Sequence, residues 1–397
     1  MLHNKFKIST GTKLNRYKVF SKTRINTLLL VVLFFLPFNA IAQIAIQGRV
    51  VSEATGLPLE GASVYFNNTS SGTSTNAVGQ FSLSLLDIEN TELIISSLGY
   101  QRLVYKPEAT TIQNKILVFK LAQKEEQLKE VLILTDAVRK KYLAIFEREF
   151  LGITEEASRS TIRNKKDIYF TKGDGKNIFN AYSDTALVIV NKMLGYTVSF
   201  ELVEFFYDEQ SGRTSYYGYT RFEEMGDKSR WIKNRKHTYY GSTAHFYRAL
   251  IANNLKKEGY QIYMIKPMRL STDNSNNGNK NMITQSKTQQ EMDVAVEVNA
   301  NQVIIKDSTD SNNFIVNVPG KLMVQYGKDP SSKNYLSKIT FIQGSLPVGF
   351  RSYVTSTSSF ISLNNAGIAN NPMDMQYSGY WIYEKAANML PLNYTPD

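Results

Sequence analysis

The sequence predicts a mainly β protein with two domains. We expect a small N-terminal β-sandwich followed by a larger, mostly antiparallel β-domain that carries one or two helices (α+β). Short stretches of alternating apolar and polar residues recur along most of the chain, and turn residues separate them. Apolar residues at helical spacing are confined to two segments of the second domain. About 355 residues follow an N-terminal leader, which is enough for two ordinary domains.

Residues 1–42 have the pattern of a secretory signal peptide. A basic stretch without acidic residues precedes the apolar run TLLLVVLFFLPF, and Ala40 and Ala42 form a cleavage motif before Gln43. The apolar core of about 11 residues is shorter than the roughly 20 that span a bilayer. We therefore expect an exported protein, periplasmic or associated with the outer membrane, without an integral membrane span after cleavage. An uncleaved N-terminal anchor is the alternative.

Charge and cysteine content narrow the classes of partner. The formal net charge is +11, and seven Lys and Arg with no acidic residue lie within residues 1–42. Subtracting these seven charges leaves +4 for the rest of the chain. Nucleic-acid binding needs a clustered basic surface on a folded domain, so we expect no nucleic-acid partner. The chain has no cysteine, which excludes disulfides and a lipoprotein acylated on Cys.

The region from Ile44 to Leu121 consists of short strands and tight turns. The alternating stretches IAIQGRVVS, SVYFNN and QFSLSL are separated by segments in which Gly56, Pro58 and Gly61 favour turns. Asn76 opens another turn, and Gly79 closes it. Six or seven strands at this spacing, without a helix, predict a β-sandwich.

The same residues carry a family resemblance. GRVVSEATGLPLEGASVYFNNTSSGTSTNAVGQFSLSL, followed by LIISSLGYQ, resembles the carboxypeptidase-regulatory-like domain. That family implies a seven-stranded transthyretin-like sandwich without catalytic residues of its own. It is common in exported proteins of the Bacteroidetes, often as an N-terminal extension of TonB-dependent receptors. Asn76 stands where the family usually has Asp, and Asn makes the same Asx-type turn.

We predict four segments. Residues 1–42 are the signal peptide, 43–121 the sandwich, 122–134 a linker with a short strand at 130–134, and 135–397 a β-rich C-terminal domain of unknown function. A helix is expected to start at Thr135 or Asp136 and end at Gly152. From Phe146 onward, motifs such as FEREFLGITEEA and WIYEKAANMLPLNY resemble the C-terminal region of exported Bacteroidetes proteins that bear the same regulatory-like domain. That resemblance implies no assigned activity.

The segment KNRKHTYYGSTAHFYRAL contains the two histidines of the predicted mature chain. The pattern predicts a strand up to Tyr240, a turn at Gly241 and a helix from Thr243 to Gly259 with Ser242 as N-cap. His237 falls on the strand, and His245 falls in the first helical turn, away from the apolar face. The candidate anion- or ligand-binding residues are Arg235, Lys236, His237, Ser242, His245 and Arg248.

Catalysis and metal binding are less favoured at this segment. Ser242 lies near His245, but there is no G-x-S-x-G elbow, and an N-capping serine is already bonded to backbone. The basic neighbours oppose a bound cation. We expect no metal and no cofactor. Two further motifs are interpreted as loops: DNSNNG at 273–278 lacks the acids of a calcium loop, and KGDGKN at 172–177 is a hairpin turn.

Two functions remain open. The first is a non-catalytic binding or structural protein of the cell envelope, whose regulatory-like domain docks a protein or glycan partner. The 24 tyrosines and 21 phenylalanines suit sugar stacking or a protein interface, and equally a β-core. The alternative is an envelope hydrolase that acts on glycan or peptide through strand-borne carboxylates. Those carboxylates are Glu201, Glu204, Asp208, Glu223 and Glu224.

Overall fold

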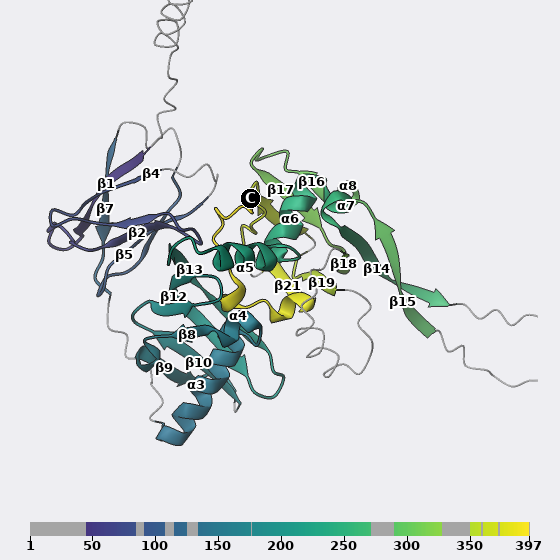
Figure 1. Ribbon diagram of the computed structural model, residues 1–397, viewed down its shortest axis with the longest axis horizontal. Coiled ribbons are helices and arrows are strands. Elements are labelled where there is room, and N and C mark those ends of the chain that lie inside the picture. The colour runs from purple at the N-terminus through teal and green to yellow at the C-terminus, as the bar shows by residue number, and fades with distance from the viewer. Residues whose placement is uncertain are drawn as a thin grey trace, which may run out of the picture. The chain divides into compact units, whose positions relative to one another are not determined.

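The computed structural model is mainly β, as the sequence predicts (Figure 1). It describes residues 45–84, 91–107, 115–124, 134–175, 177–270, 290–327, 350–358, 360–371 and 374–396. The predicted signal peptide and the DNSNNG loop lie outside these residues, as does the predicted strand at 130–134 except for Leu134. No helix within the described ranges is both long and apolar enough to cross a bilayer.

The first domain is a seven-stranded β-sandwich, which confirms the prediction. One sheet has the order β4-β1-β7 and the other β3-β2-β5-β6, and every pair except the parallel β1–β7 is antiparallel. Their apolar inner faces meet in one core that includes Ile46, Val64 and Phe119. Asn76 makes the expected turn, because its Oδ1 accepts from the Val78 and Gln80 amides at 3.1 and 2.8 Å. The strands are β1 (Ala45–Ser52), β2 (Ser63–Phe66), β3 (Gly72–Ser74), β4 (Gln80–Ser84), β5 (Leu93–Ser96), β6 (Leu103–Tyr105) and β7 (Ile116–Leu121).

A six-stranded antiparallel sheet follows. Its order is β8-β11-β12-β10-β9, with β13 paired to β12 along nearly the whole length of both strands. A register shift between Leu202 and Glu204 leaves Val203 as a bulge in β12. The strands are β8 (Ser160–Ile162), β9 (Ile168–Lys172), β10 (Ile178–Ser183), β11 (Leu187–Asn191), β12 (Tyr196–Asp208) and β13 (Thr214–Glu224). The KGDGKN segment joins β9 to β10 as the predicted hairpin connection.

Helix α3 (Asp136–Leu151) packs on this sheet. Thr135 is its N-cap, with the side chain accepting from the Val138 amide, and Gly152 ends it at φ 95°, a conformation that favours glycine. Both ends agree with the prediction. The buried rings of Phe146 and Phe150 stack on each other and join a core with strand residues such as Phe205. Helix α4 (Glu155–Ser158) and the 3-10 turn η1 (Lys165–Asp167) complete the region.

The remainder of the chain adds two smaller antiparallel sheets. One has the order β15-β14-β18-β19-β21 and the other β16-β17-β20. The strands are β14 (Tyr260–Leu270), β15 (Gln290–Val298), β16 (Ile304–Lys306), β17 (Asn313–Asn317), β18 (Lys321–Tyr326), β19 (Phe350–Ser356), β20 (Phe360–Asn364) and β21 (Met375–Gly379). The helical elements are α6 (Thr243–Ile251), α7 (Leu255–Glu258), α8 (Ala300–Val303), η3 (Tyr380–Tyr383) and η4 (Ala386–Asn388). Phe246 and Leu250 of α6 and Trp381 of η3 lie in the core between them.

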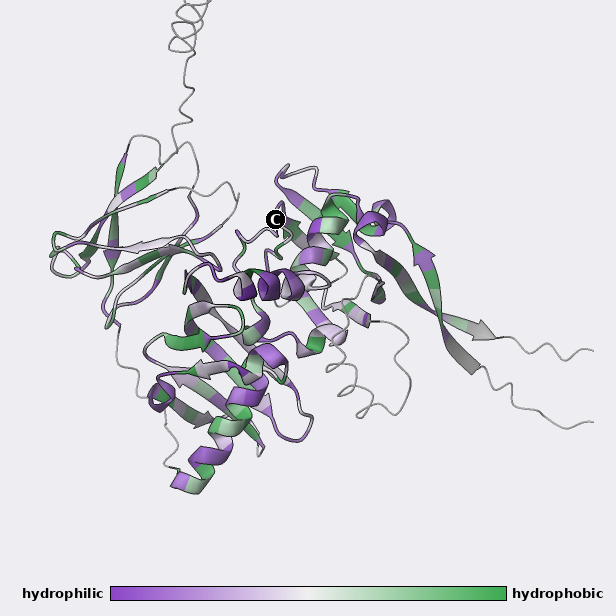
Figure 2. Ribbon diagram, viewed as in Figure 1, coloured by the Kyte–Doolittle hydropathy of each residue, from purple (hydrophilic) through white to green (hydrophobic). Residues whose placement is uncertain are grey.

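The predicted strand before Gly241 is wrong. Residues Ser229–Tyr239 form helix α5, most of whose residues are hydrophilic (Figure 2). Trp231, Arg235 and Tyr239 are buried, and their four-residue spacing places them on one helical face. A Cβ at Gly195 would overlap the Trp231 ring, so this glycine lets the helix approach β12. The sequence pattern did not reveal this helix, because the buried face of α5 includes a charged residue, Arg235, where an apolar residue is expected.

The helix predicted from Thr243 to Gly259 is divided into α6 and α7. Asn253 between them has φ 54°, the left-handed conformation that Asn tolerates, and Gly259 ends α7 as expected. Ser242 is the N-cap, as predicted. The predicted outward position of His245 is wrong, because the side chain is 3% exposed. The His245 side chain is covered by α7 and β14, through Glu258 and Tyr260.

Candidate ligand-binding cleft

Arg235 is a structural residue in this fold. Its guanidinium donates to the carbonyls of Leu194 and Gly195 at 2.8 and 3.1 Å and pairs with Glu224 at 3.0 Å. It also lies 3.9 Å from the centre of the Tyr196 ring. These contacts use the donors that an anion would need. Lys236 and His237 lie on the exposed side of α5, so the structure does not bring them together with Arg235 at one site.

Arg248 binds backbone rather than an open anion site. Its two terminal nitrogens donate to the carbonyls of Leu392 and Tyr394 at 2.6 and 2.9 Å. The Leu392 amide donates in turn to the Asn68 carbonyl in the sandwich at 2.7 Å. Arg248 therefore holds a C-terminal segment that connects α6 with the first domain.

Of the six predicted residues, Ser242 and His245 contact each other directly. Ser242 Oγ accepts from the His245 amide at 3.2 Å and donates to the Tyr239 carbonyl at 2.7 Å. The Gly241 amide donates to His245 Nδ1 at 3.1 Å, which assigns the ring proton to Nε2, 3.2 Å from a Glu258 carboxylate oxygen. Ser242 Oγ therefore does not point its proton at the imidazole, as a serine nucleophile would.

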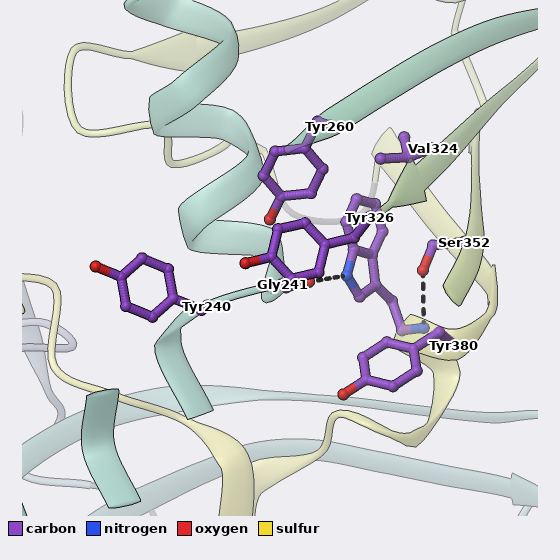
Figure 3. A pocket seen from close by; sticks show the side chains of 8 residues that line it. Tyr240, Gly241, Tyr260, Val324, Tyr326, Ser352 and Tyr380 are labelled. Carbon is purple, nitrogen blue, oxygen red and sulfur yellow. Dashed lines mark hydrogen bonds between the residues drawn. The ribbon is translucent and has the colours of Figure 1, made fainter. Parts of the chain in front are cut away.

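The cavity beside this histidine is small. Its volume is about 20 Å³, and four tyrosines and Trp381 surround it; Trp381 Nε1 donates to the Gly241 carbonyl at 2.9 Å (Figure 3). A cavity of about 10–15 Å³ holds one water molecule. The cavity is thus too small for a substrate. The segment forms an aromatic core that contains the buried His245 side chain.

A pair of acids lies near the start of α6. Glu384 keeps part of its residue surface exposed, but protein atoms surround its carboxyl group. Burial raises the pKa of Glu384 to about 8; a hydrogen bond from the Thr243 amide lowers this pKa, and the charge of Glu156 raises it. Glu156 is buried and accepts from the Thr238 hydroxyl at 3.1 Å. Across the described residues, no three His, Asp or Glu side chains form a cluster that could hold a metal.

Glu201 of β12 connects the sandwich with the six-stranded sheet. Its carboxylate accepts from Tyr65 Oη at 2.8 Å and Ser96 Oγ at 2.7 Å, and it pairs with Arg102 Nε at 2.6 Å. All three donors belong to the four-stranded sheet of the sandwich or its β5–β6 loop. Burial, and then Glu201, raise the pKa of the Tyr65 hydroxyl, so Tyr65 remains protonated and donates.

Backbone pairing strengthens this junction. The Asn68 amide donates to the Thr220 carbonyl at 2.7 Å, and the Phe222 amide donates to the Thr69 carbonyl at 2.9 Å. The β2–β3 loop of the sandwich thus covers the free edge of β13. Thr69 and Thr220 are both fully buried. Residues 44–397 accordingly form a single compact unit.

A cleft of about 640 Å³ lies beside this junction. The β5–β6 loop and Lys124 form one wall, and strands β9, β10 and β12 with the β10–β11 turn form the other. Ligand pockets are typically about 300–1,000 Å³. The lining includes Ser96, Ser97, Tyr100, Gln101, Arg102 and Lys124 on the first wall, and Tyr169, Tyr182, Asp184, Thr185, Glu201 and Val203 on the second.

The charges of the cleft are arranged in pairs. Arg102 pairs with Glu201 at its inner part, and Lys124 Nζ lies 2.8 Å from Asp184 Oδ1 at its exposed part. Tyr169 and Tyr182 stack with ring centres 5.7 Å apart. Burial raises the pKa of Tyr169, and the charge of Asp184 raises it further. The site thus presents hydroxyls, tyrosine rings and neutralised charges.

No pattern in the sequence predicts this cleft. Tyr100 belongs to the LGYQ motif that supports the family resemblance, and Glu201 is one of the strand-borne candidate acids. Tyr169 and Tyr182 lie on predicted strands. No spacing in the sequence shows that these residues share a site, because they come from four separate stretches of chain.

Residues 46–133 match the model of the CarboxypepD_reg-like domain family. The first domain is therefore a regulatory-like β-sandwich and not a catalytic carboxypeptidase domain. The match covers less than a quarter of the chain and carries no family assignment for the rest. No curated protein matches the chain.

Several solved structures show a weak likeness. One is a candidate membrane-associated protein of unknown function from Bacteroides fragilis, at 10% identity and a TM-score of 0.17, with 40% of this chain and 64% of that chain covered. A second is described as a candidate carbohydrate binding protein from Bacteroides uniformis, at 8% identity and a TM-score of 0.16, covering 81% of this chain and 99% of that one. A 9R-lipoxygenase from Cyanothece has 10% identity, a TM-score of 0.16, and coverage of 54% and 49%. At these scores the likenesses support no functional argument.

Proposed function

We propose that this protein is an exported, non-catalytic binding protein of the cell envelope, periplasmic or associated with the outer membrane. Its regulatory-like domain docks a partner by forming one wall of the cleft beside Glu201. The observation that carries the proposal is the cleft itself, since both walls belong to one compact unit and the volume suits a ligand.

The junction supports a preformed site. Glu201 fixes the sandwich wall through three donors, and strand pairing of the β2–β3 loop with β13 fixes it again nearby. A site whose walls are already held together loses less conformational entropy when it binds. This arrangement favours binding without a large closing movement.

Site-specific photo-crosslinking in intact host cells tests the proposal. A photoreactive amino acid replaces Gln101, an exposed residue of the cleft wall, or Lys306, an exposed residue of β16 outside the cleft, as the matched control. The proposal predicts one envelope component that crosslinks repeatedly at 101 and not at 306. Crosslinking at 101 that never exceeds the level at 306 would contradict it.

A second candidate is an envelope hydrolase, and one observation favours it: the raised pKa of Glu384 close to Glu156 is of the kind that acid–base catalysis uses. Of the strand-borne carboxylates, Glu201, Glu223 and Glu224 are paired with arginines, and Asp208 accepts hydrogen bonds in a turn.

Turnover of envelope glycan or peptide that is lost in Glu384→Gln and Glu156→Gln, but kept in Glu204→Gln, would establish the hydrolase. Equal activity in all three variants would remove these acids as its catalytic pair.

A further inference from the structure

The cleft has a lining whose formal charges cancel. Among its described residues, Arg102 and Lys124 carry two positive charges, and Asp184 and Glu201 carry two negative charges. Each cation is within 2.8 Å of its partner acid. A charged ligand would compete with the largely buried Arg102–Glu201 pair and, more weakly, with the exposed Lys124–Asp184 pair. A neutral polar ligand leaves both pairs intact.

The other chemistry of the lining is hydroxyl and aromatic. Serine, threonine and glutamine side chains from both walls supply donors and acceptors, and the stacked rings of Tyr169 and Tyr182 are half-buried at the second wall. Tyrosine combines an apolar face with a polar end. A ligand that matches this lining has many neutral hydroxyl groups together with apolar C–H faces.

We infer that the cleft binds a neutral oligosaccharide, with a sugar ring lying against Tyr182 and its hydroxyls bonded to the Ser97–Gln101 loop. The inference rests on the proposed binding function and adds the chemical class of the ligand. Paired charges at both ends of the site then act as neutral hydrogen-bonding groups and select against uronic acids and amino sugars.

Isothermal titration calorimetry with defined ligands tests this. The full chain without residues 1–42 is titrated with neutral α- and β-linked hexose hexasaccharides, an oligogalacturonate and a chitosan oligosaccharide of matched length, and an uncharged hexapeptide. We expect binding of at least one neutral sugar and weakening of roughly tenfold in Tyr182→Ala, with little change in Tyr182→Phe, which keeps the ring. Tyr263→Ala, which removes a half-buried tyrosine of β14 outside the cleft, is the matched control.

The outcomes separate the two levels of the proposal. A charged sugar or the peptide that binds more tightly than the neutral sugars, and is weakened by Tyr182→Ala, overturns the neutral-sugar class but leaves the cleft as the binding site. Neutral-sugar binding that is unaffected by Tyr182→Ala places the sugar elsewhere and overturns the inference. No binding of any probe, together with cleft-specific crosslinking at position 101, overturns the sugar class alone. No binding together with no crosslinking overturns the proposed function as well.

Discussion

At the scale of single residues, Glu201 and Glu384 show how burial determines the role of a carboxylate. Glu201 accepts from three donors, one of them charged, and so joins two sheets. Protein atoms surround the Glu384 carboxyl group, which has one backbone donor and lies near the charge of Glu156. Its burial favours the neutral form of Glu384.

Replacing Glu201 should destabilise the protein more than replacing an exposed carboxylate does. Glu201→Ala removes the acceptor of Tyr65 and Ser96 and leaves Arg102 unpaired. Because the Arg102 side chain is 26% exposed, water replaces part of the lost interaction. We expect a loss of about 2–3 kcal/mol in the free energy of unfolding, measured by urea denaturation. Glu204→Ala, an exposed carboxylate on the same strand, should change it by less than about 0.5 kcal/mol. Equal effects of the two changes would contradict the role of Glu201.

The raised pKa of Glu384 should make the free energy of unfolding fall as pH rises. Its pKa is about 8 in the folded protein against an ordinary value of 4.5, so the folded state binds the proton more tightly than the unfolded state. The stabilisation is fully present below about pH 4.5 and is lost as pH rises toward 8. The free energy of unfolding measured from pH 5 to 9 should therefore decline more steeply in the wild type than in Glu384→Gln. Parallel curves for the two proteins would show that Glu384 does not titrate in this range.

At the scale of elements, the sequence predicts correctly those features that depend on residues close to one another in the chain. The sandwich turns at Asn76 and Gly61 and the caps of α3 depend on neighbouring residues, and they could be predicted. Helix α5 was mistaken for a strand because its inner face includes Arg235, whose burial depends on carbonyls some 40 positions away. The lining of the cleft comes from six separate stretches of chain, and no pattern within any one of them predicts it.

The N-cap of α6 gives a prediction at this scale. Ser242→Ala removes the acceptor of the His245 amide, and we expect a loss of about 1 kcal/mol in the free energy of unfolding. Ser242→Asp should recover most of it, because aspartate caps helices equally well. If Ser242 were instead a nucleophile, the two variants would have equal stability and differ in activity from the wild type. Thermal or urea denaturation of the three proteins distinguishes these cases.

At the scale of the whole molecule, several sets of contacts connect the two domains. They include the Glu201 network, the pairing of the β2–β3 loop with β13, and the C-terminal segment that Arg248 holds against Asn68. These three connections come from different parts of the chain, and each reaches the four-stranded sheet of the sandwich or its loops. They hold the two walls of the cleft together.

Loss of Arg248 should loosen the C-terminal segment. In Arg248→Ala, hydrogen exchange at the amides of Leu392 and Tyr394 should be at least about tenfold faster than in the wild type, because the carbonyls of both residues lose their donors. Arg163→Ala, which removes an exposed arginine elsewhere, serves as the control. Unchanged exchange at 392 and 394 would mean that the contacts with Asn68 and Ser70 hold the segment without Arg248.

The most direct test of the account is to block the cleft. Because the natural sequence has no cysteine, a single Gln101→Cys change allows a bulky maleimide to be attached in the cleft wall, and Ser308→Cys attaches the same group at an exposed turn outside it. Capture of envelope material by the two labelled proteins is then compared. The account predicts that the label at 101 abolishes the capture seen with the unlabelled protein, while the label at 308 leaves it intact. Equal capture by both labelled proteins would show that the binding site lies elsewhere.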